Sequence, residues 1–133
     1  MDPRRRHCVC GGDGAAARAR TEMRGFLDEV LRAGHPVPVA AQDAALLVAS
    51  ELVANAVRHT PGPCTLDVSW GRGGIDIDVT DPSPEAPRLR RADRAGAGGG
   101  YGWPLVRRLA TEVAVRPTGS GGKTVHAHLP ALG

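Results

Sequence analysis

The chain has 133 residues, of which 3% are aromatic, and a formal net charge of +3, so we expect one domain with a modest aliphatic core. This mild charge argues only weakly for nucleic acid, and the basic cluster Arg4–Arg6 has no aromatic platform beside it on which bases could stack. Three cysteines exclude a disulfide framework, no apolar run reaches the ~20 residues of a membrane span, and no secretory signal pattern opens the chain. We therefore expect a soluble, cytoplasmic protein.

The first 14 residues are basic and then rich in glycine, and they allow two interpretations: a short strand over His7–Cys10 or a loose arm. In a strand, Cys8 and Cys10 would share one face, which together with His7 makes a partial metal-ligand pattern. No fourth ligand is evident, and free thiols in a reducing cytosol are the alternative. The main domain is expected to occupy residues 15–133.

Two helices are expected next. Residues 15–33 carry apolar side chains at helical spacing, and Gly34 is a plausible stop. The second helix begins near Ala40 and ends near His59, where a segment with two prolines turns the chain. Its apolar residues lie all round the helix rather than on one stripe, so this helix should be buried.

Glu51 and Asn55 stand out as polar side chains within the apolar part of the second helix. They are four residues apart, so they share a face, and Arg58 falls on that face too. A buried amide without a hydrogen-bond partner costs roughly 2–7 kcal/mol, so we expect a bound ligand to complete both side chains. The alternatives are an ion pair of Glu51 with Arg58 or His59, and a capping or internally satisfied role for Asn55.

After the second helix the apolar period changes from helical to alternating. Residues 65–70 and 75–80 each place their apolar side chains on one face, and a glycine-rich turn at Gly71–Gly74 joins them into a hairpin. From Asp81 to Gly100 no period survives. Loops of this length in a compact domain are usually functional or disordered.

A short helix over Tyr101–Ala110 should start near Trp103, because Pro104 fits only a first turn. Strands are expected around residues 113–115 and 124–129, separated by a glycine-rich turn. The sequence therefore predicts an α/β (α+β) two-layer sandwich, in which a mixed or antiparallel sheet carries about three helices on one face.

Two histidines, His126 and His128, alternate with the apolar residues of the last strand and so share its polar face. We expect them to face Asp76 or Asp78 in cross-strand pairs rather than to bind a metal.

Four motifs resemble the GHKL superfamily of ATP-binding domains, which gyrase, histidine kinases and anti-sigma factor kinases share. They are SELVANAVRH at 50–59, DVTDPSP at 78–84, GGGYGWPLVRRLA at 98–110 and GGKTVHAHL at 121–129. In this order they are most similar to the short, single-domain actinobacterial anti-sigma regulatory factors of the serine/threonine-protein kinase type. The resemblance covers about Ala15 to Leu129 and implies a histidine-kinase-like ATPase fold with a lid over about 82–100.

The resemblance also implies a role for the polar residues of the second helix. Asn55 would be the Mg²⁺ ligand, because a neutral amide oxygen suits a hard cation that takes its other ligands from phosphates and water. Glu51 would be the catalytic base that accepts a proton from an attacking hydroxyl or water. Arg58 and His59 would contact phosphates, although for His59 an interaction with the helix dipole is an equal alternative.

In the later motifs Asp81 would accept a hydrogen bond from the adenine amino group, unless it is a plain turn-starting aspartate. The glycine run would let the backbone approach phosphates, and the next helix would direct its N–H groups at them; a flexible linker is the alternative. Either Lys123 or Thr124 would line the adenine end. The nucleotide-binding residues that the resemblance implies are Asn55, Arg58, His59, Asp81, Ser83, Gly98, Gly99, Gly100, Tyr101, Gly102, Leu105 and Thr124.

As a whole, the resemblance implies an anti-sigma regulatory factor that uses Mg²⁺ and ATP to phosphorylate a serine or threonine of an anti-sigma factor antagonist. It also implies a sigma factor as a second partner and a homodimer, with no membrane and no direct nucleic-acid binding. The alternative is a nucleotide-gated protein-binding module with little or no kinase activity, which the lid prolines and Trp103 favour. A basic nucleic-acid binder would instead lose affinity steeply with salt.

Overall fold

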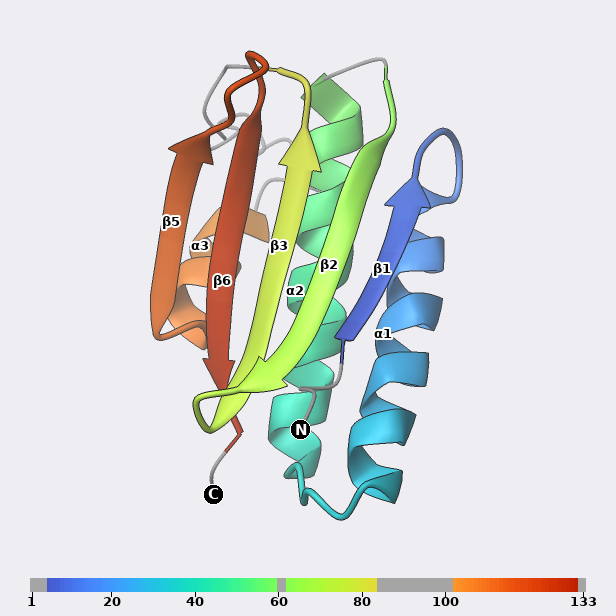
Figure 1. Cartoon of the computed structure of the whole chain (residues 1–133), viewed down its shortest axis with the longest axis vertical. Coiled ribbons are helices and arrows are strands. Elements are labelled where there is room, and N and C mark those ends of the chain that lie inside the picture. The colour runs from blue at the N-terminus through green and yellow to red at the C-terminus, as the bar shows by residue number, and fades with distance from the viewer. Residues whose placement is uncertain (1–4, 60–61, 84–101, 132–133) are drawn as a thin grey trace.

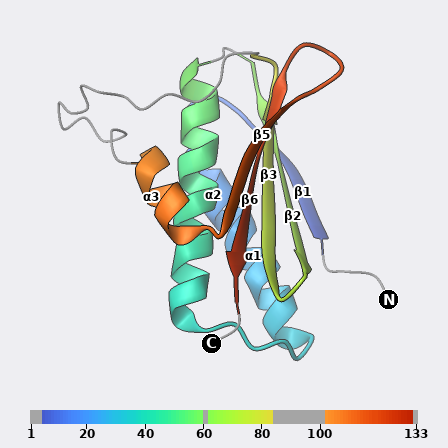
Figure 2. The same cartoon turned by 90° about the vertical axis from the view of Figure 1, so that its left-hand side faces the viewer.

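The structure is a computed structural model that describes residues 5–59, 62–83 and 102–131. These residues form two layers, with three helices on one face of a five-stranded sheet (Figures 1 and 2). Every strand pair is antiparallel and the strand order is β1-β2-β3-β6-β5. The predicted two-layer α+β sandwich is confirmed, and the sheet is antiparallel rather than mixed.

The strands alternate apolar and polar side chains, as the period of two requires. The apolar side chains face the helices, and those of β2, β3 and β6 make up much of the core. Of the two interpretations of the first residues, the structure has the strand, because β1 pairs with β2 along its whole length. The strand bounds are β1 Arg5–Cys10, β2 Cys64–Gly71, β3 Gly74–Asp81, β5 Glu112–Pro117 and β6 Lys123–Pro130.

The helices are α1 Ala15–Arg32, α2 Val39–His59 and α3 Gly102–Leu109, close to the predicted bounds. One stripe of α1 faces the core, where Met23 and Phe26 are fully buried. Burying each such side chain contributes about 1.5–3 kcal/mol.

An ion-pair bridge links β1 to α1. Arg6 lies 3.1 Å from Glu22 and 3.2 Å from Glu29. A Cβ at Gly25 would come within 2.6 Å of the Arg6 guanidinium, so a glycine in the middle of α1 leaves room for this side chain. The bridge explains why an edge strand that starts the described chain is held against the helix layer.

The core helix of the domain is α2, which lies between α1 and α3 and against β2, β3 and β6 (Figure 2). Its residues Val39–Arg58 are long and apolar enough to cross a membrane by length and composition alone, although no such run was expected from the sequence. The prediction that α2 is buried all round is wrong, since Val39 is 70% exposed and Leu47 is half-buried. In a two-layer fold no second sheet covers the outer side of this helix.

Candidate functional site

The candidate site lies where the end of β3 and the start of β6 meet the C-terminal part of α2. Asp81 ends β3 and lies opposite Lys123, which begins β6. Both face the helices, as do the buried Val79 and Val125 two residues away on the same strands. Asn55 of α2 lines the same small cavity of about 10 Å³ as Asp81 and Lys123. The structure thus brings together the predicted metal ligand and the predicted adenine contact.

This cavity offers about the room that one water molecule needs. Apolar side chains complete its wall, including Leu52 and Ala56 of α2. A nucleotide is far larger, so only one hydrogen-bonding edge of such a ligand fits against these residues. The predicted contacts Gly98, Gly99, Gly100 and Tyr101, and most of the predicted lid, lie outside the residues that the structure describes.

Asp81 and Lys123 form a buried ion pair, with side chains 2% and 6% exposed. The Lys123 ammonium donates to Asp81 Oδ1 at 3.1 Å and to Oδ2 at 3.0 Å. It also donates to the Ser83 carbonyl oxygen at 3.3 Å, and the Ser83 N–H donates to Asp81 Oδ1 at 2.8 Å. Asp81 is therefore far more than a turn-starting residue, because its carboxylate is fixed by three hydrogen bonds.

Glu51 and Asn55 are half-buried, which corrects the prediction that both are buried. The cause is again the two-layer arrangement, because no other element among the described residues covers the outer side of α2. Within the described chain neither side chain makes a hydrogen bond or an ion pair, and Arg58 is exposed. The alternative in which Glu51 pairs with Arg58 is therefore not formed, and the side chain of His59, the other predicted partner, lies outside what the structure describes. Asn55 keeps its amide free while it lines the cavity beside Asp81.

Gly122 permits the close approach of β6 to the end of β3. A Cβ at this position would overlap the Asp81 carbonyl oxygen and lie 2.9 Å from Pro82 Cα. Any residue with a side chain would push the two strands apart. The glycine before Lys123 is therefore what allows the ammonium group to reach Asp81.

Thr124 lies on the other face of the sheet, where its hydroxyl is 2.8 Å from that of Thr80. The structure does not bring it to the site, which corrects the placement inferred from the resemblance. Lys123 takes that position because neighbouring residues of a strand point to opposite faces. The sequence could have indicated this position of Lys123. The alternation that places Val125 in the core also places Lys123 there, and a buried cation requires an acidic partner.

The model of one family, the histidine kinase-like ATPase domain, matches residues 14–128. The chain belongs to this family. It is therefore an ATP-binding domain of the GHKL type, as the four motifs implied. No curated protein matches the chain.

In this ATPase domain α3 begins at Gly102, where the third motif ends its glycine run. Pro104 lies in the first turn of α3, as expected. Leu105 is half-buried on the same helix, and Trp103 packs against the core. The first N–H groups of α3 follow directly on the glycine run of the third motif.

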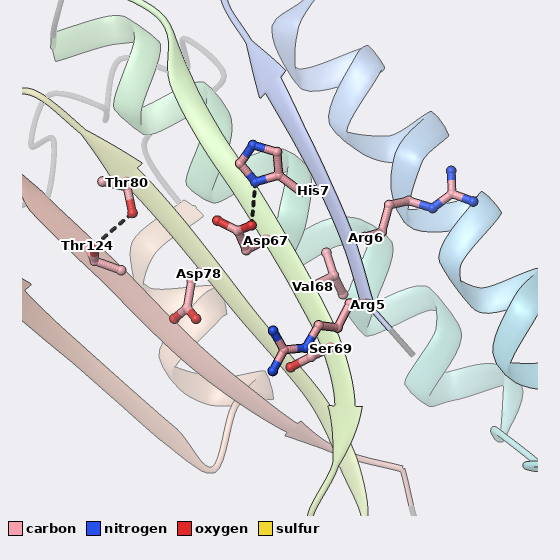
Figure 3. A pocket seen from close by; sticks show the side chains of 9 residues that line it. All are labelled: Arg5, Arg6, His7, Asp67, Val68, Ser69, Asp78, Thr80 and Thr124. Atoms are coloured by element: carbon pink, nitrogen blue, oxygen red, sulfur yellow. Dashed lines mark hydrogen bonds and ion pairs between the residues drawn. The ribbon is translucent and has the colours of Figure 1, made fainter. Parts of the chain in front are cut away.

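A larger hollow of about 550 Å³ lies on the opposite face of the sheet, where no described helix covers it (Figures 2 and 3). Its carboxylates already have partners, because His7 Nδ1 lies 2.5 Å from Asp67 and His126 Nδ1 lies 2.7 Å from Asp78. We place the candidate site at the smaller cavity, because the free amide and the buried carboxylate are there. The hollow is lined by Arg5, Arg6, His7, Asp67, Val68, Ser69, Asp78, Thr80 and Thr124.

The cysteines form a separate group at the junction of β1 and β2. Cys8 Sγ lies 3.2 Å from Cys10 Sγ, and Cys10 pairs in register with Cys64. Burial raises the pKa of Cys8 to about 12 and that of Cys64 to about 11. Among the described residues no group of three or more His, Cys, Asp or Glu side chains is arranged to hold a metal ion.

Proposed function

We propose that this domain binds ATP with Mg²⁺ and phosphorylates a serine or threonine of an anti-sigma factor antagonist. The observation that carries the proposal is the free pair on α2: Glu51 and Asn55 lie one turn apart and have no partner within the described chain. Both side chains are half-buried, so a ligand can still reach them, and Asn55 lines the cavity beside the Asp81 carboxylate.

The donor set fits Mg²⁺. One neutral amide oxygen, without a cage of carboxylates, suits an ion that keeps waters and takes phosphate oxygens as ligands. Asn55 would hold the ion, which would offset the negative charge of the phosphates. Asp81 would accept a hydrogen bond from the base, while Arg58, His59 and the start of α3 would contact phosphates.

Glu51 is the candidate base. Its carboxylate lies one turn before Asn55 on the same face of α2 and is half-buried, so it is close to the proposed phosphate position without being sealed from substrate. It would accept the proton of the attacking hydroxyl, the phosphoryl group would move to that oxygen, and ADP would leave. The resemblance further supports a cytoplasmic location, a sigma factor as a second partner and a homodimer.

The test is incubation with γ-labelled ATP, Mg²⁺ and a candidate antagonist protein. We expect label on a serine or threonine of the antagonist, and Glu51→Gln should abolish transfer while ATP affinity is kept. Asp43→Asn is the matched control, because Asp43 is an exposed acid on the same helix. Binding of ATP without transfer to any antagonist would refute the kinase and support the nucleotide-gated module.

A second variant tests the ion. Asn55→Ala should leave the fold intact and remove the part of ATP affinity that depends on Mg²⁺, measured by calorimetry with and without the ion. An unchanged Mg²⁺ dependence would contradict the role of Asn55.

A further inference from the structure

Asp81 and Lys123 form a charged pair at the end of a row that is otherwise apolar. On the helix side of the sheet, β3 and β6 first pair Ile75 with Leu129, Ile77 with Ala127 and Val79 with Val125. An apolar pair at the last position would be neutral or stabilising compared with a buried ion pair. Stability therefore does not explain why a charged pair occupies this position. Its location on the wall of the cavity does explain it.

The hydrogen bonds leave one acceptor position open on Asp81. An ionised carboxylate has about four lone-pair positions. Lys123 takes one on Oδ1 and one on Oδ2, and the Ser83 N–H takes the second on Oδ1. One position on Oδ2 is left to accept from a ligand in the cavity that Asp81 lines.

Lys123 is the only lysine in the chain, and all other permanently cationic side chains are arginines. An ammonium group has three donors, and here it meets three acceptors: the two Asp81 oxygens and the Ser83 carbonyl oxygen. A guanidinium group would bring five N–H groups into the same space. The ammonium matches its surroundings without a surplus donor that would compete for the open position on Oδ2.

We propose that Lys123 is a positioning residue for base selection: its ammonium holds the Asp81 carboxylate in one orientation, with one acceptor position left for an exocyclic amino group. A base that presents a carbonyl oxygen at this place would meet a carboxylate and be rejected. The chemistry selected is a purine with an amino group at C6, as in adenine, whereas guanine has a carbonyl oxygen at C6 and its amino group at C2. This inference rests on the nucleotide binding proposed above.

Binding is measured by calorimetry for ATP, GTP and inorganic triphosphate with the wild-type domain and Lys123→Met. The wild type should prefer ATP to GTP. Lys123→Met should weaken ATP by about 10-fold or more, since a hydrogen bond to a charged group is disturbed, and leave triphosphate affinity unchanged. A merely structural role would weaken ATP and triphosphate together.

The double variant Asp81→Asn with Lys123→Met guards against a failure to fold, because it leaves no buried charge unpaired. It should fold and lose the preference for ATP over GTP. Since the chain has one lysine, side-chain labelling of lysine gives a single NMR signal, which ATP should shift more than triphosphate does.

Two failures are distinguishable. A wild-type domain that binds neither ATP nor triphosphate overturns the proposed function and this inference with it. A wild-type domain that prefers ATP, with the same preference in Lys123→Met, overturns the role of Lys123 alone, whereas an unchanged preference in the double variant overturns the role of Asp81 in reading the base.

Discussion

The two faces of the β3–β6 ladder use the same device, an acid paired with a base across two strands, in opposite environments. On the helix side Asp81 and Lys123 are almost fully buried beside a cavity. On the outer side Asp78 pairs with His126 and Asp76 pairs with His128, on a face without helices. Asp78 keeps 38% of its side chain exposed, whereas Asp81 keeps 2%.

The comparison shows that the burial of the acid, rather than pairing, separates the two faces, because His126 and His128 are also buried while Asp78 and Asp76 keep more of their side chains exposed than Asp81 does. In water the ions of an exposed pair gain little from each other, because solvent screens them. In the core the same pair is strongly coupled, and removing one member leaves a charge with no compensation. Breaking the buried pair should therefore cost more stability than breaking a pair on the outer face.

The largest effect is expected for Lys123→Met. It leaves the Asp81 carboxylate buried and unpaired, so the free energy of unfolding should fall by about 3–5 kcal/mol, a large part of the 5–15 kcal/mol typical of a domain. Urea unfolding followed by circular dichroism measures the loss. The double variant with Asp81→Asn should recover most of it, and a double variant as unstable as the single one would show that the loss has another cause.

A smaller effect is expected for Gly122→Ala. The new Cβ would overlap the Asp81 carbonyl oxygen, so β6 must shift and the unfolding free energy should fall by about 1–3 kcal/mol. Gly119→Ala in the same turn is the control, because nothing lies within 4 Å of a Cβ there. Equal effects of the two substitutions would argue that the turn, and not the approach to Asp81, sets the result.

On the outer face we expect little from Asp78→Asn. The pair with His126 is partly exposed, so its loss should change the unfolding free energy by no more than about 1 kcal/mol, less at high salt. ATP affinity should not change, because this face lies across the sheet from Asn55. A loss as large as that of Lys123→Met would remove the distinction between the two faces.

A sequence pattern predicts only those features of the fold that depend on residues close together in the chain. The helical and alternating periods are local, so they predicted α1, α2, the β2–β3 hairpin and the polar face that His126 and His128 share. Which of the two aspartates each histidine meets was left open, because that depends on the register of β3 with β6. The Asp81–Lys123 contact joins residues 42 positions apart, and it depends on the register of β3 with β6. The period along one strand does not determine how that strand is aligned with its neighbour.

The degree of burial was also beyond local signals. Apolar residues all round α2 predicted full burial, but the number of layers decides how many sides of a helix are covered. This domain has two layers, so Glu51 and Asn55 are half-buried. Lys123 could have been singled out from the sequence, because the chain's only lysine falls on the apolar phase of its last strand.

The last prediction concerns the reactivity of the cysteines rather than the stability of the fold. The cysteines lie on the β1–β2 side of the same core. Burial raises the pKa of Cys64 to about 11, and the nearby Asp81 charge adds to the increase. A raised thiol pKa favours the protonated form, so the associated stability is present below the unfolded pKa and is lost as pH rises through about 11.

At pH 8 the folded domain should therefore react with iodoacetamide about 100-fold more slowly at Cys64 than the same chain does in urea, because only the thiolate is nucleophilic. Mass spectrometry of the modified peptides gives the rate for each cysteine. Cys8 is half-buried, but its pKa is raised to about 12, so it should also be slow. Fast modification of Cys8 with slow modification of Cys64 would mean that steric access, and not thiol ionisation, controls reactivity in this part of the fold.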